Sequence, residues 1–386
     1  INWEGYMFPS WQSSVAKGQA LKEYERRMSV LEGCVLSYLV RTESNVLTNY
    51  PNMSVLRTTN FAASVKDPGV LYLSGLRKRE FQINDCIAKR NNFRTGPSLI
   101  FCDWTDFENS FIPDFEYIFQ SEMSESAAEV NANLDANAKG CKCKDKCSVA
   151  KGCCSFKSHS AYTSDGILKD LSEIDDDSKD KSFGAPADCV DVYECGDACA
   201  CSSGRCDQRV LQKGHQRLLV VFRHYRKGWT LRNGPTEIKD GAFICEYVGE
   251  MINSKEACCR VDKTYQFDLE VKTTTSVRNT TTTLVIDSNK KGNESRFLAH
   301  SCSPNVYTQK VHCEIAGTPK RRLGMFARKD IQPGEELTID YHPAVTDPNI
   351  FHVLCLKNKF TCKCGAPNCR EVAYQASLPK GKSSKS

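Results

Sequence analysis

Cysteines at very short spacing are the residues of this chain best suited to chemistry. Nine of them form two groups separated by a gap: Cys141, Cys143, Cys147, Cys153 and Cys154, then Cys195, Cys199, Cys201 and Cys206. Thiolates one and three residues apart cannot all form disulfides without strain, because a disulfide needs a particular Cα separation and dihedral angle. They can converge on zinc, whose tetrahedral sulfur sites accept close ligand spacing. Nine ligands are too few for three separate four-sulfur sites, but they suffice for three zinc ions that share three bridging thiolates.

A second cysteine group comes late in the chain. Cys302 lies within a short His-Ser-Cys run, and Cys362, Cys364 and Cys369 follow it. Four thiolates make one closed tetrahedral site, so the sequence predicts four zinc ions per chain. A disulfide-rich secreted domain is the alternative. It is disfavoured because 22 cysteines without a secretory signal fit a reducing compartment. Most of the nine cysteines outside both groups are expected to be small buried side chains.

Length and charge set broad limits on function. With 386 residues the chain is long enough for two or three domains. No stretch approaches about 18 consecutive apolar residues, so no membrane partner is expected. The net charge of +5 is uneven: residues 101–138 hold nine acids and no lysine or arginine, a solvated face in the simplest interpretation. The stretch from Arg205 to Arg232 holds eight basic residues and one acid, and could hold an anionic ligand or make a weak contact with DNA phosphates.

The elements that must position these residues are mostly short strands. Apolar runs separated by turns predict strands at 218–222, 242–248, 264–269, 283–286, 306–309, 311–315, 322–327 and 336–339. Such a pattern indicates a mainly β fold of small folded-over sheets. Residues 18–38 have the apolar spacing of an amphipathic helix. Residues 114–118 are expected to form an extended run, and the acid-rich stretch at 173–180, within 155–188, is expected to be a solvent loop.

Two motifs in the second half carry a family resemblance. The run Arg296-Phe297-Leu298-Ala299-His300-Ser301-Cys302-Ser303-Pro304-Asn305 is similar to R-F-x-N-H-S-C-x-P-N, and Glu335-Glu336-Leu337-Thr338-Ile339-Asp340-Tyr341 is similar to E-E-L-T-x-D-Y. Residues 246–250, 265–269 and 292–293 match in the same order. Together with both cysteine groups, these motifs resemble the SET-domain lysine methyltransferases of the suppressor-of-variegation subgroup. That subgroup methylates lysine 9 of histone H3.

The resemblance implies a domain order. It implies a SET-domain fold with a threaded, pseudoknotted C-terminal part, flanked by zinc-organised pre-SET and post-SET segments. The expected parts are an N-terminal region of uncertain, partly helical fold at 1–100, an acidic lead-in at 101–140, the pre-SET segment at 141–210, the SET catalytic domain at 211–345, the post-SET segment at 346–373 and a disordered basic tail at 374–386.

The resemblance also implies a reaction and its residues. The expected activity is methyl transfer from S-adenosylmethionine to the histone H3 tail, at lysine 9, on nucleosomes in nuclear chromatin. Tyr341 and Tyr265 are the expected catalytic residues, with Tyr341 orienting the amine rather than removing its proton. Phe267, Ile339 and Tyr341 are expected to bind the substrate. Ile339, two residues before Tyr341, has no hydroxyl, which predicts di- and trimethylated product.

The cofactor pocket is implied in the same way. The residues expected to hold S-adenosylmethionine are Lys227, Gly228, Trp229, Thr230, Tyr265, Arg296, Phe297, Ala299, His300 and Phe360. Backbone groups are expected to make most of these contacts. His300 is therefore expected to act through its main chain rather than as a zinc ligand.

Two departures from the family pattern keep other functions open. Thr230 replaces a glycine, and Ala299 replaces an asparagine whose lost hydrogen bond costs about 0.5–1.5 kcal/mol. One alternative is a zinc-scaffolded chromatin-binding protein that has lost methyl transfer. Apart from these departures, a methyltransferase for another histone lysine or for a non-histone substrate is a further alternative.

Overall fold

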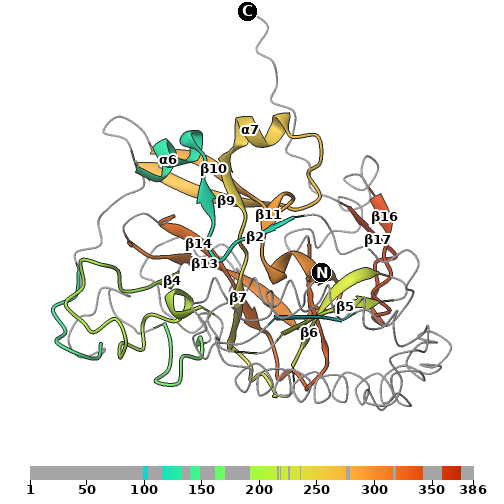
Figure 1. Cartoon of the computed structure of the whole chain (residues 1–386), viewed down its shortest axis with the longest axis horizontal. Helices are drawn as coiled ribbons and strands as arrows, with labels where there is room; N and C mark the ends of the chain where they lie inside the picture. Colours follow the sequence, from blue (N-terminus) through green and yellow to red (C-terminus); the bar gives the residue numbers. More distant parts are fainter. Residues whose placement is uncertain are drawn as a thin grey trace, which may run out of the picture.

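The computed structural model describes residues 99–102, 115–132, 140–147, 161–169, 192–214, 217, 219–224, 227–234, 236–274, 279–315, 319–341 and 359–374. The predicted helix at 18–38 and the tail at 374–386, apart from its first residue, lie outside these ranges, as do Cys153 and Cys154. The described part is mainly β, as the sequence predicts, with two short α-helices, α6 (Glu125–Ala132) and α7 (Ser254–Cys259) (Figure 1). None of its helices is long and apolar enough to cross a bilayer.

A five-stranded sheet joins segments that are far apart in the sequence. Its order is β1 (Leu99–Cys102), β5 (Leu219–His224), β6 (Gly228–Asn233), β15 (Glu336–Ile339) and β12 (Ala299–His300). Strand β15 runs antiparallel to β6 and parallel to β12. It thus fills a position between two strands that precede it in the chain. This insertion places the two sequence motifs side by side.

A four-stranded sheet carries both α-helices. Its order is β3 (Glu122–Met123), β8 (Glu250–Asn253), β10 (Asn279–Asp287) and β9 (Gln266–Thr274). Helix α7 begins directly after β8, where the Asn253 side chain accepts a hydrogen bond from Glu256 N at 2.9 Å and caps the helix. Helix α6 contacts β8 and β10, so the segment before the first cysteines packs on this sheet (Figure 1).

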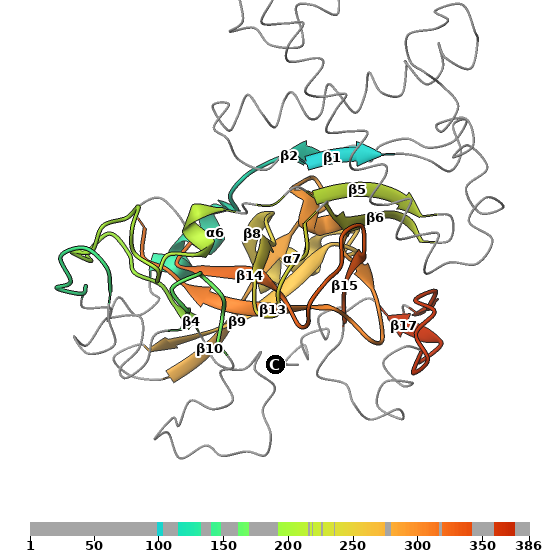
Figure 2. The ribbon, with the colours of Figure 1, turned by 90° about the horizontal axis from the view of Figure 1, so that it is seen from below.

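A third sheet connects the first cysteine group to the rest of the fold. Its order is β4 (Val192–Tyr193), β13 (Val306–His312), β14 (Arg321–Ala327) and β7 (Phe243–Glu246). Two small pairs complete the strands: β2 (Glu116–Tyr117) with β11 (Lys291–Gly292), and β16 (Lys359–Thr361) with β17 (Val372–Tyr374). Figure 2 shows β4 and β17 at opposite ends of the domain, so the two cysteine groups flank the sheets.

The main core lies between the sheets. Its fully buried apolar side chains include Leu231 of β6, Ile244 of β7, Leu284 of β10 and Met325 of β14. Burying each such side chain contributes about 1.5–3 kcal/mol. Two short 3-10 helices, η4 (Leu211–Lys213) and η5 (Glu294–Phe297), pack their buried residues beside these strands.

Several sequence expectations are corrected by the structure. The predicted strands at 306–309 and 311–315 merge into one strand, β13, because Lys310 pairs in register with Leu323, and this strand ends at His312 rather than at residue 315. Strands β9 and β10 each extend over nine residues, longer than predicted. Strands β6 and β8 were not predicted. The solvent loop expected at 173–180 lies outside the described residues, while Tyr162 and Leu168, earlier in the same stretch, are buried in a second apolar cluster.

Four of the cysteines outside the two groups have described side chains, and these four divide into two kinds. Cys245 and Cys313 are fully buried, as expected for small apolar side chains. Cys258 and Cys259 are exposed at the end of α7, so these two are exceptions to an expectation made for most of the nine. The helix has only one buried residue, Ala257, so its last turn faces solvent.

Candidate functional site

Tyr341 follows the end of β15 and turns back toward β12. Its hydroxyl donates a hydrogen bond to Leu298 O at 2.8 Å, and its backbone N–H donates to His300 Nδ1 at 3.2 Å. The residue is 39% exposed, yet its hydroxyl is engaged inside the protein. Desolvation raises the pKa of Tyr341 above its ordinary value, and the neighbouring Tyr247 and Tyr265 raise it further. The phenol is therefore protonated at neutral pH and serves as a hydrogen-bond donor rather than as a base.

Tyr265 is held by both its main chain and its ring. Its carbonyl oxygen accepts hydrogen bonds from Tyr247 Oη at 2.8 Å and from Ser288 N at 3.1 Å. The guanidinium of Arg296 lies 4.1 Å from the centre of its ring and 4.4 Å from that of Phe115. A buried guanidinium stacked on aromatic faces in this way fixes the orientation of both rings. Motif reasoning did not assign roles to Tyr247, Ser288 or Phe115.

Ile339 and Phe267 line the interior near these tyrosines. Ile339 is 5% exposed, belongs to the main apolar core and lies opposite His300 between β15 and β12. Phe267 is partly buried against the same core, and its ring centre lies 5.7 Å from that of Tyr247.

The predicted cofactor segment at 227–230 forms the start of β6. The ammonium of Lys227 pairs with Glu336 Oε2 at 2.6 Å, so this side chain joins β6 to β15. Gly228 adopts a φ of 82°, a conformation that favours glycine. The side chain of Thr230 is fully buried, whereas Trp229 is partly buried against the core. The main chain is therefore the part of this segment available to a ligand.

The imidazole of His300 joins the Tyr341 segment to the second cysteine group. Its Nδ1 accepts the Tyr341 N–H, which leaves the proton on Nε2, and Nε2 lies 3.5 Å from Cys302 Sγ. The residue is 6% exposed. The expectation that His300 acts mainly through its main chain is therefore incomplete, since the ring also makes structural contacts. Ala299 pairs with Thr338 across β12 and β15, and Phe360 lies in β16 opposite Ala373.

Asn305 ties the two motifs together. Its side-chain amide donates to Glu335 Oε1 at 3.0 Å and to Glu336 O at 2.8 Å. Its Oδ1 accepts a hydrogen bond from Thr338 N at 2.9 Å. The residue is 3% exposed, so these bonds are protected from water. Asn305 ends the first motif, and its position in that motif was the only sequence signal for this role.

The second cysteine group has the geometry of a metal site. The Sγ atoms of Cys302, Cys362, Cys364 and Cys369 all lie within 4.8 Å of one another, and those of Cys302 and Cys362 are 3.9 Å apart. Zinc–sulfur bonds of about 2.3 Å in a tetrahedron would separate sulfurs by about 3.8 Å. These residues therefore fit a zinc ion.

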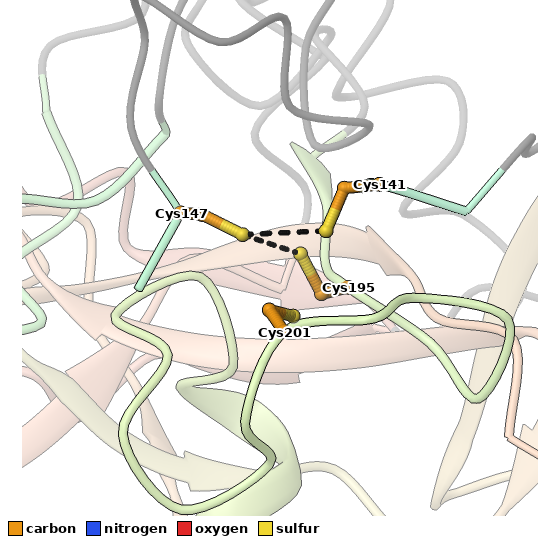
Figure 3. A group of neighbouring side chains, drawn as sticks. All are labelled: Cys141, Cys147, Cys195 and Cys201. Carbon is orange, nitrogen blue, oxygen red and sulfur yellow. Dashed lines mark hydrogen bonds between the residues drawn. The ribbon is translucent and has the colours of Figure 1, made fainter. Parts of the chain in front are cut away.

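The first cysteine group contains a second set of four. Cys141, Cys147, Cys195 and Cys201 have Sγ atoms within 4.8 Å of one another. The sulfur of Cys147 points toward two of the others, at 3.6 Å from that of Cys141 and 3.4 Å from that of Cys195 (Figure 3). Cys143, Cys199 and Cys206 belong to the same cluster, and a hydrogen bond with Cys195 lowers the pKa of Cys206 to about 5. A thiolate is the form that binds metal.

This cluster is attached to the third sheet by polar contacts. Arg209 Nη2 donates to Gly196 O at 2.7 Å and lies 3.6 Å from Cys201 Sγ. Glu194, which is 5% exposed, accepts hydrogen bonds from Tyr162 Oη at 3.0 Å and Leu211 N at 2.7 Å. Desolvation raises the pKa of Glu194, although these donors oppose the shift. The cluster is thus fixed to the body of the domain.

Comparison with known proteins identifies both parts. A SET domain model matches residues 235–342, and a Pre-SET motif model matches residues 94–209. The histone-lysine N-methyltransferase Su(var)3-9 of Drosophila pseudoobscura pseudoobscura is 30% identical over 271 residues, which cover 67% of this chain and 39% of that protein. The H3 lysine-9 specific enzyme of Schizosaccharomyces pombe is 31% identical over 334 residues, which cover 81% and 62%. The H3 lysine-36 specific enzyme of Homo sapiens is 36% identical over 190 residues, which cover 48% and 6%.

Solved structures agree with these matches. Arabidopsis thaliana SUVH6 in complex with SAM is 28% identical, with a TM-score of 0.52, over 71% of this chain and 52% of that one. KRYPTONITE in complex with mCHH DNA, an H3(1-15) peptide and SAH is 27% identical, with a TM-score of 0.53, over 72% and 52%. The chain therefore covers 39% of the length of the Drosophila relative and 62% of the length of the S. pombe relative.

Proposed function

This chain belongs to the SUV39-type family of proteins that join a pre-SET motif to a SET domain, and we propose that it is an S-adenosylmethionine-dependent histone-lysine methyltransferase. The observation that carries the proposal is the pairing of β12 with β15. This pairing sets the hydroxyl of Tyr341 against the Leu298 carbonyl, near Tyr265.

The chemistry requires alignment more than proton removal. S-adenosylmethionine, when bound, supplies an electrophilic sulfonium methyl group. The chain must present a neutral lysine amine in line with that group and exclude water. The Tyr341 hydroxyl donates its proton to the Leu298 carbonyl, so the two oxygens lie close together and can both accept hydrogen bonds from the N–H groups of the amine, which leaves its lone pair free for attack. The rings of Tyr265 and Phe267 would limit access of water.

We assign cofactor contacts to the main chain of residues 227–230 and 296–300, and to Phe360. The pairing of Lys227 with Glu336 supports main-chain rather than ammonium contact at that position. Burial of Thr230 counts against the pseudo-methyltransferase alternative, because this departure from the family pattern faces the protein interior. The chain is expected to hold four zinc ions, three on the nine cysteines of the first group and one on Cys302, Cys362, Cys364 and Cys369.

The proposed substrate is lysine 9 of the histone H3 tail, on nucleosomes in the nucleus. The relative of S. pombe named for lysine 9 and the KRYPTONITE complex with an H3 peptide support this choice. The human relative named for lysine 36 keeps a second lysine as the alternative. In the basic stretch proposed to touch DNA weakly, Arg205 is exposed whereas Arg209 and Arg232 are buried, so only part of the stretch can reach a phosphate.

The test is a methylation assay with product mass resolved. Recombinant chain is incubated with S-adenosylmethionine and H3 peptides that carry either native lysine 9 or arginine in its place, and with a peptide spanning lysine 36. We expect di- and trimethylated product on the first peptide alone. Equal labelling of the arginine peptide would contradict the choice of lysine, and labelling of no peptide would contradict the activity.

A further inference from the structure

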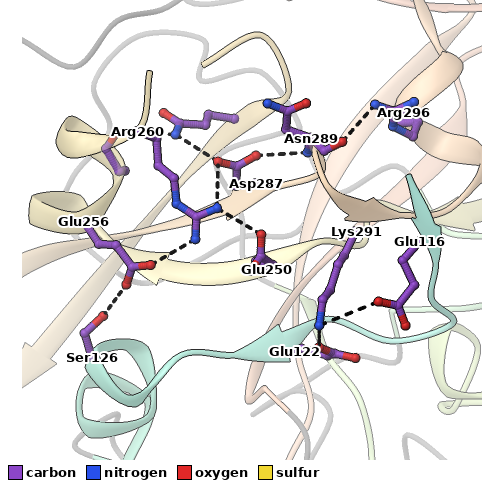
Figure 4. Close-up of polar contacts among 12 residues, drawn as sticks. Glu116, Glu122, Ser126, Glu250, Glu256, Arg260, Asp287, Asn289, Lys291 and Arg296 are labelled. Carbon is purple, nitrogen blue, oxygen red and sulfur yellow. Dashed lines mark hydrogen bonds and ion pairs between the residues drawn. The ribbon is translucent and has the colours of Figure 1, made fainter. Parts of the chain in front are cut away.

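Asp287, the last residue of β10, is surrounded by polar partners in the interior. It is 1% exposed. Its Oδ1 accepts a hydrogen bond from Asn289 N at 3.0 Å, and its Oδ2 accepts one from Gln266 Nε2 at 3.1 Å. The guanidinium of Arg260 lies 3.8 Å from Oδ2 (Figure 4). Burying a carboxylate costs free energy unless such partners compensate the loss of water. The number of partners around Asp287 therefore indicates that its carboxylate has a role.

The bond to Asn289 shapes the turn that follows β10. A carboxylate that accepts from the N–H two residues later forms an Asx turn. This turn directs two carbonyls at Arg296, whose Nε donates to Ser288 O at 3.0 Å and whose Nη2 donates to Asn289 O at 3.2 Å (Figure 4). The same guanidinium stacks on the ring of Tyr265. The turn therefore determines how Arg296 meets that ring.

The hydrogen bond between Gln266 and Asp287 restrains the main chain next to Tyr265. Gln266 directly follows Tyr265 in the chain and begins β9. Its side chain is joined to Asp287, while Ser288 N donates to the Tyr265 carbonyl at 3.1 Å. The ring, the carbonyl and the next side chain of Tyr265 are thus all held by Asp287 or by the turn that it closes.

Arg260 holds the carboxylate of Asp287 within a longer network. Its guanidinium also pairs with Glu250 Oε2 at 2.9 Å and with Glu256 Oε1 at 3.0 Å. Ser126 of α6 donates to Glu256 Oε2 at 3.1 Å. Figure 4 shows these contacts running from α6 to Arg296. The segment before the first cysteines is thereby connected to the tyrosine region through side chains.

We infer that Asp287 is a positioning residue for Tyr265 and Arg296 in methyl transfer, an inference that rests on the proposed function. It touches neither substrate nor cofactor. It acts by fixing the 287–289 turn and the start of β9, and Arg260 keeps its carboxylate in place. Loss of the carboxylate would let the Tyr265 ring and the Arg296 guanidinium move relative to each other.

The test compares Asp287→Ala, Asp287→Asn and Lys291→Gln in the full chain, by steady-state kinetics and thermal melting. Lys291 is the matched control because its ion pairs, with Glu122 at 2.6 Å and Glu116 at 3.9 Å, do not involve Asp287 (Figure 4). Asp287→Ala should lower kcat at least about tenfold, since a displacement of about 1 Å near reacting groups can cost about 100-fold. Its KM for the H3 peptide should change less. Asp287→Asn keeps an oxygen for Asn289 N and should restore most of kcat, and Lys291→Gln should match the wild type.

A folded Asp287→Ala variant with wild-type kcat and KM would overturn the inference. If that variant does not fold, Gln266→Leu decides, because it removes the bond to Asp287 and leaves Arg260 in place. It should lower kcat at a temperature where the variant remains folded, and wild-type kinetics would overturn the inference. A wild-type chain that methylates no peptide contradicts the proposed function instead. Titration of S-adenosylhomocysteine then decides about Asp287, with unchanged affinity in Asp287→Ala as the overturning result.

Discussion

Arg370 Nη2 lies 2.6 Å from Asp340 Oδ1 and donates a hydrogen bond to it, so the last cysteine segment is joined to the residue immediately before Tyr341. The backbone N–H of Arg370 also donates to Cys302 Sγ at 3.3 Å. One residue therefore contacts both the proposed zinc site and the segment that carries the tyrosine. Residues 342–358 separate the two segments in sequence, so these contacts join segments that are not adjacent along the chain.

The first prediction concerns this ion pair. Arg370→Ala should lower kcat about three- to tenfold, because a partly buried hydrogen bond between charged groups is lost beside Tyr341. Zinc content should stay at the wild-type value, since no ligand is removed. Metal analysis and kinetics on the same preparation check both points. Lys363→Ala, at an exposed position of the same segment, is the control. An Arg370→Ala variant with full activity would show that the pair does not position Tyr341.

The second prediction concerns metal removal at the late cysteine group. Cys364→Ser should reduce the zinc content by one ion and abolish most activity, because three thiolates no longer close the tetrahedron. The melting transition should survive, since the first cysteine group lies at the opposite end of the sheets. Cys258→Ser, at an exposed cysteine on α7, should change neither quantity. Full activity with one zinc fewer would separate this site from catalysis.

The third prediction concerns pH. A raised pKa keeps the proton on Tyr341 past the ordinary tyrosine value of about 10, whereas the substrate lysine loses its proton as pH rises toward about 10.4. The rate should therefore rise from pH 7 to about pH 9.5 with no falling limb from Tyr341. Initial rates after preincubation at each pH, followed by assay at pH 8, separate titration from inactivation. Tyr341→Phe should lower kcat by at least about 100-fold at every pH. A reversible fall in rate below pH 9 would contradict the assignment of a protonated phenol.

The fourth prediction concerns product state. Ile339→Tyr should shift the product toward monomethyl lysine, because a second hydroxyl and a larger ring would crowd the amine near Tyr341. Affinity for S-adenosylhomocysteine should remain unchanged. Ile339→Val, which keeps a smaller apolar side chain at this core position, is the control for packing and should still give di- and trimethyl product. Mass spectrometry after long incubation measures the distribution. Wild-type protein that stops at monomethyl lysine would refute the role of Ile339.

Local patterns in the sequence predicted the fold class and several strands well. The run at 336–339 coincides with β15 because alternating and apolar residues reflect burial directly. Cysteine spacing predicted that Cys302, Cys362, Cys364 and Cys369 would come together. Metal ligands can be recognised by residue type and local spacing, whatever the sequence between them. The burial of Tyr162 and Leu168 was missed because the residues around them are mostly polar and form no apolar run.

Long-range polar partners could not be predicted in the same way. Asp287 and Arg260 carry no motif, and their role depends on which strands become neighbours in the four-stranded sheet. The ring of His300 is similar: its contact with Tyr341 N appears only when β15 lies beside β12. A single sequence gives the residue types, but the partners of a buried polar group are set by the tertiary fold.

The central position of β15 has a consequence for biosynthesis. During translation β6 and β12 are made well before the strand that will lie between them, so both present open edges while the ribosome completes the chain. Open strand edges are templates for pairing with other chains. The delay also makes β15 a long-range closure, which slows folding. The nascent protein is therefore most exposed to misassembly just before Tyr341 emerges, and protection by a chaperone matters most at that stage.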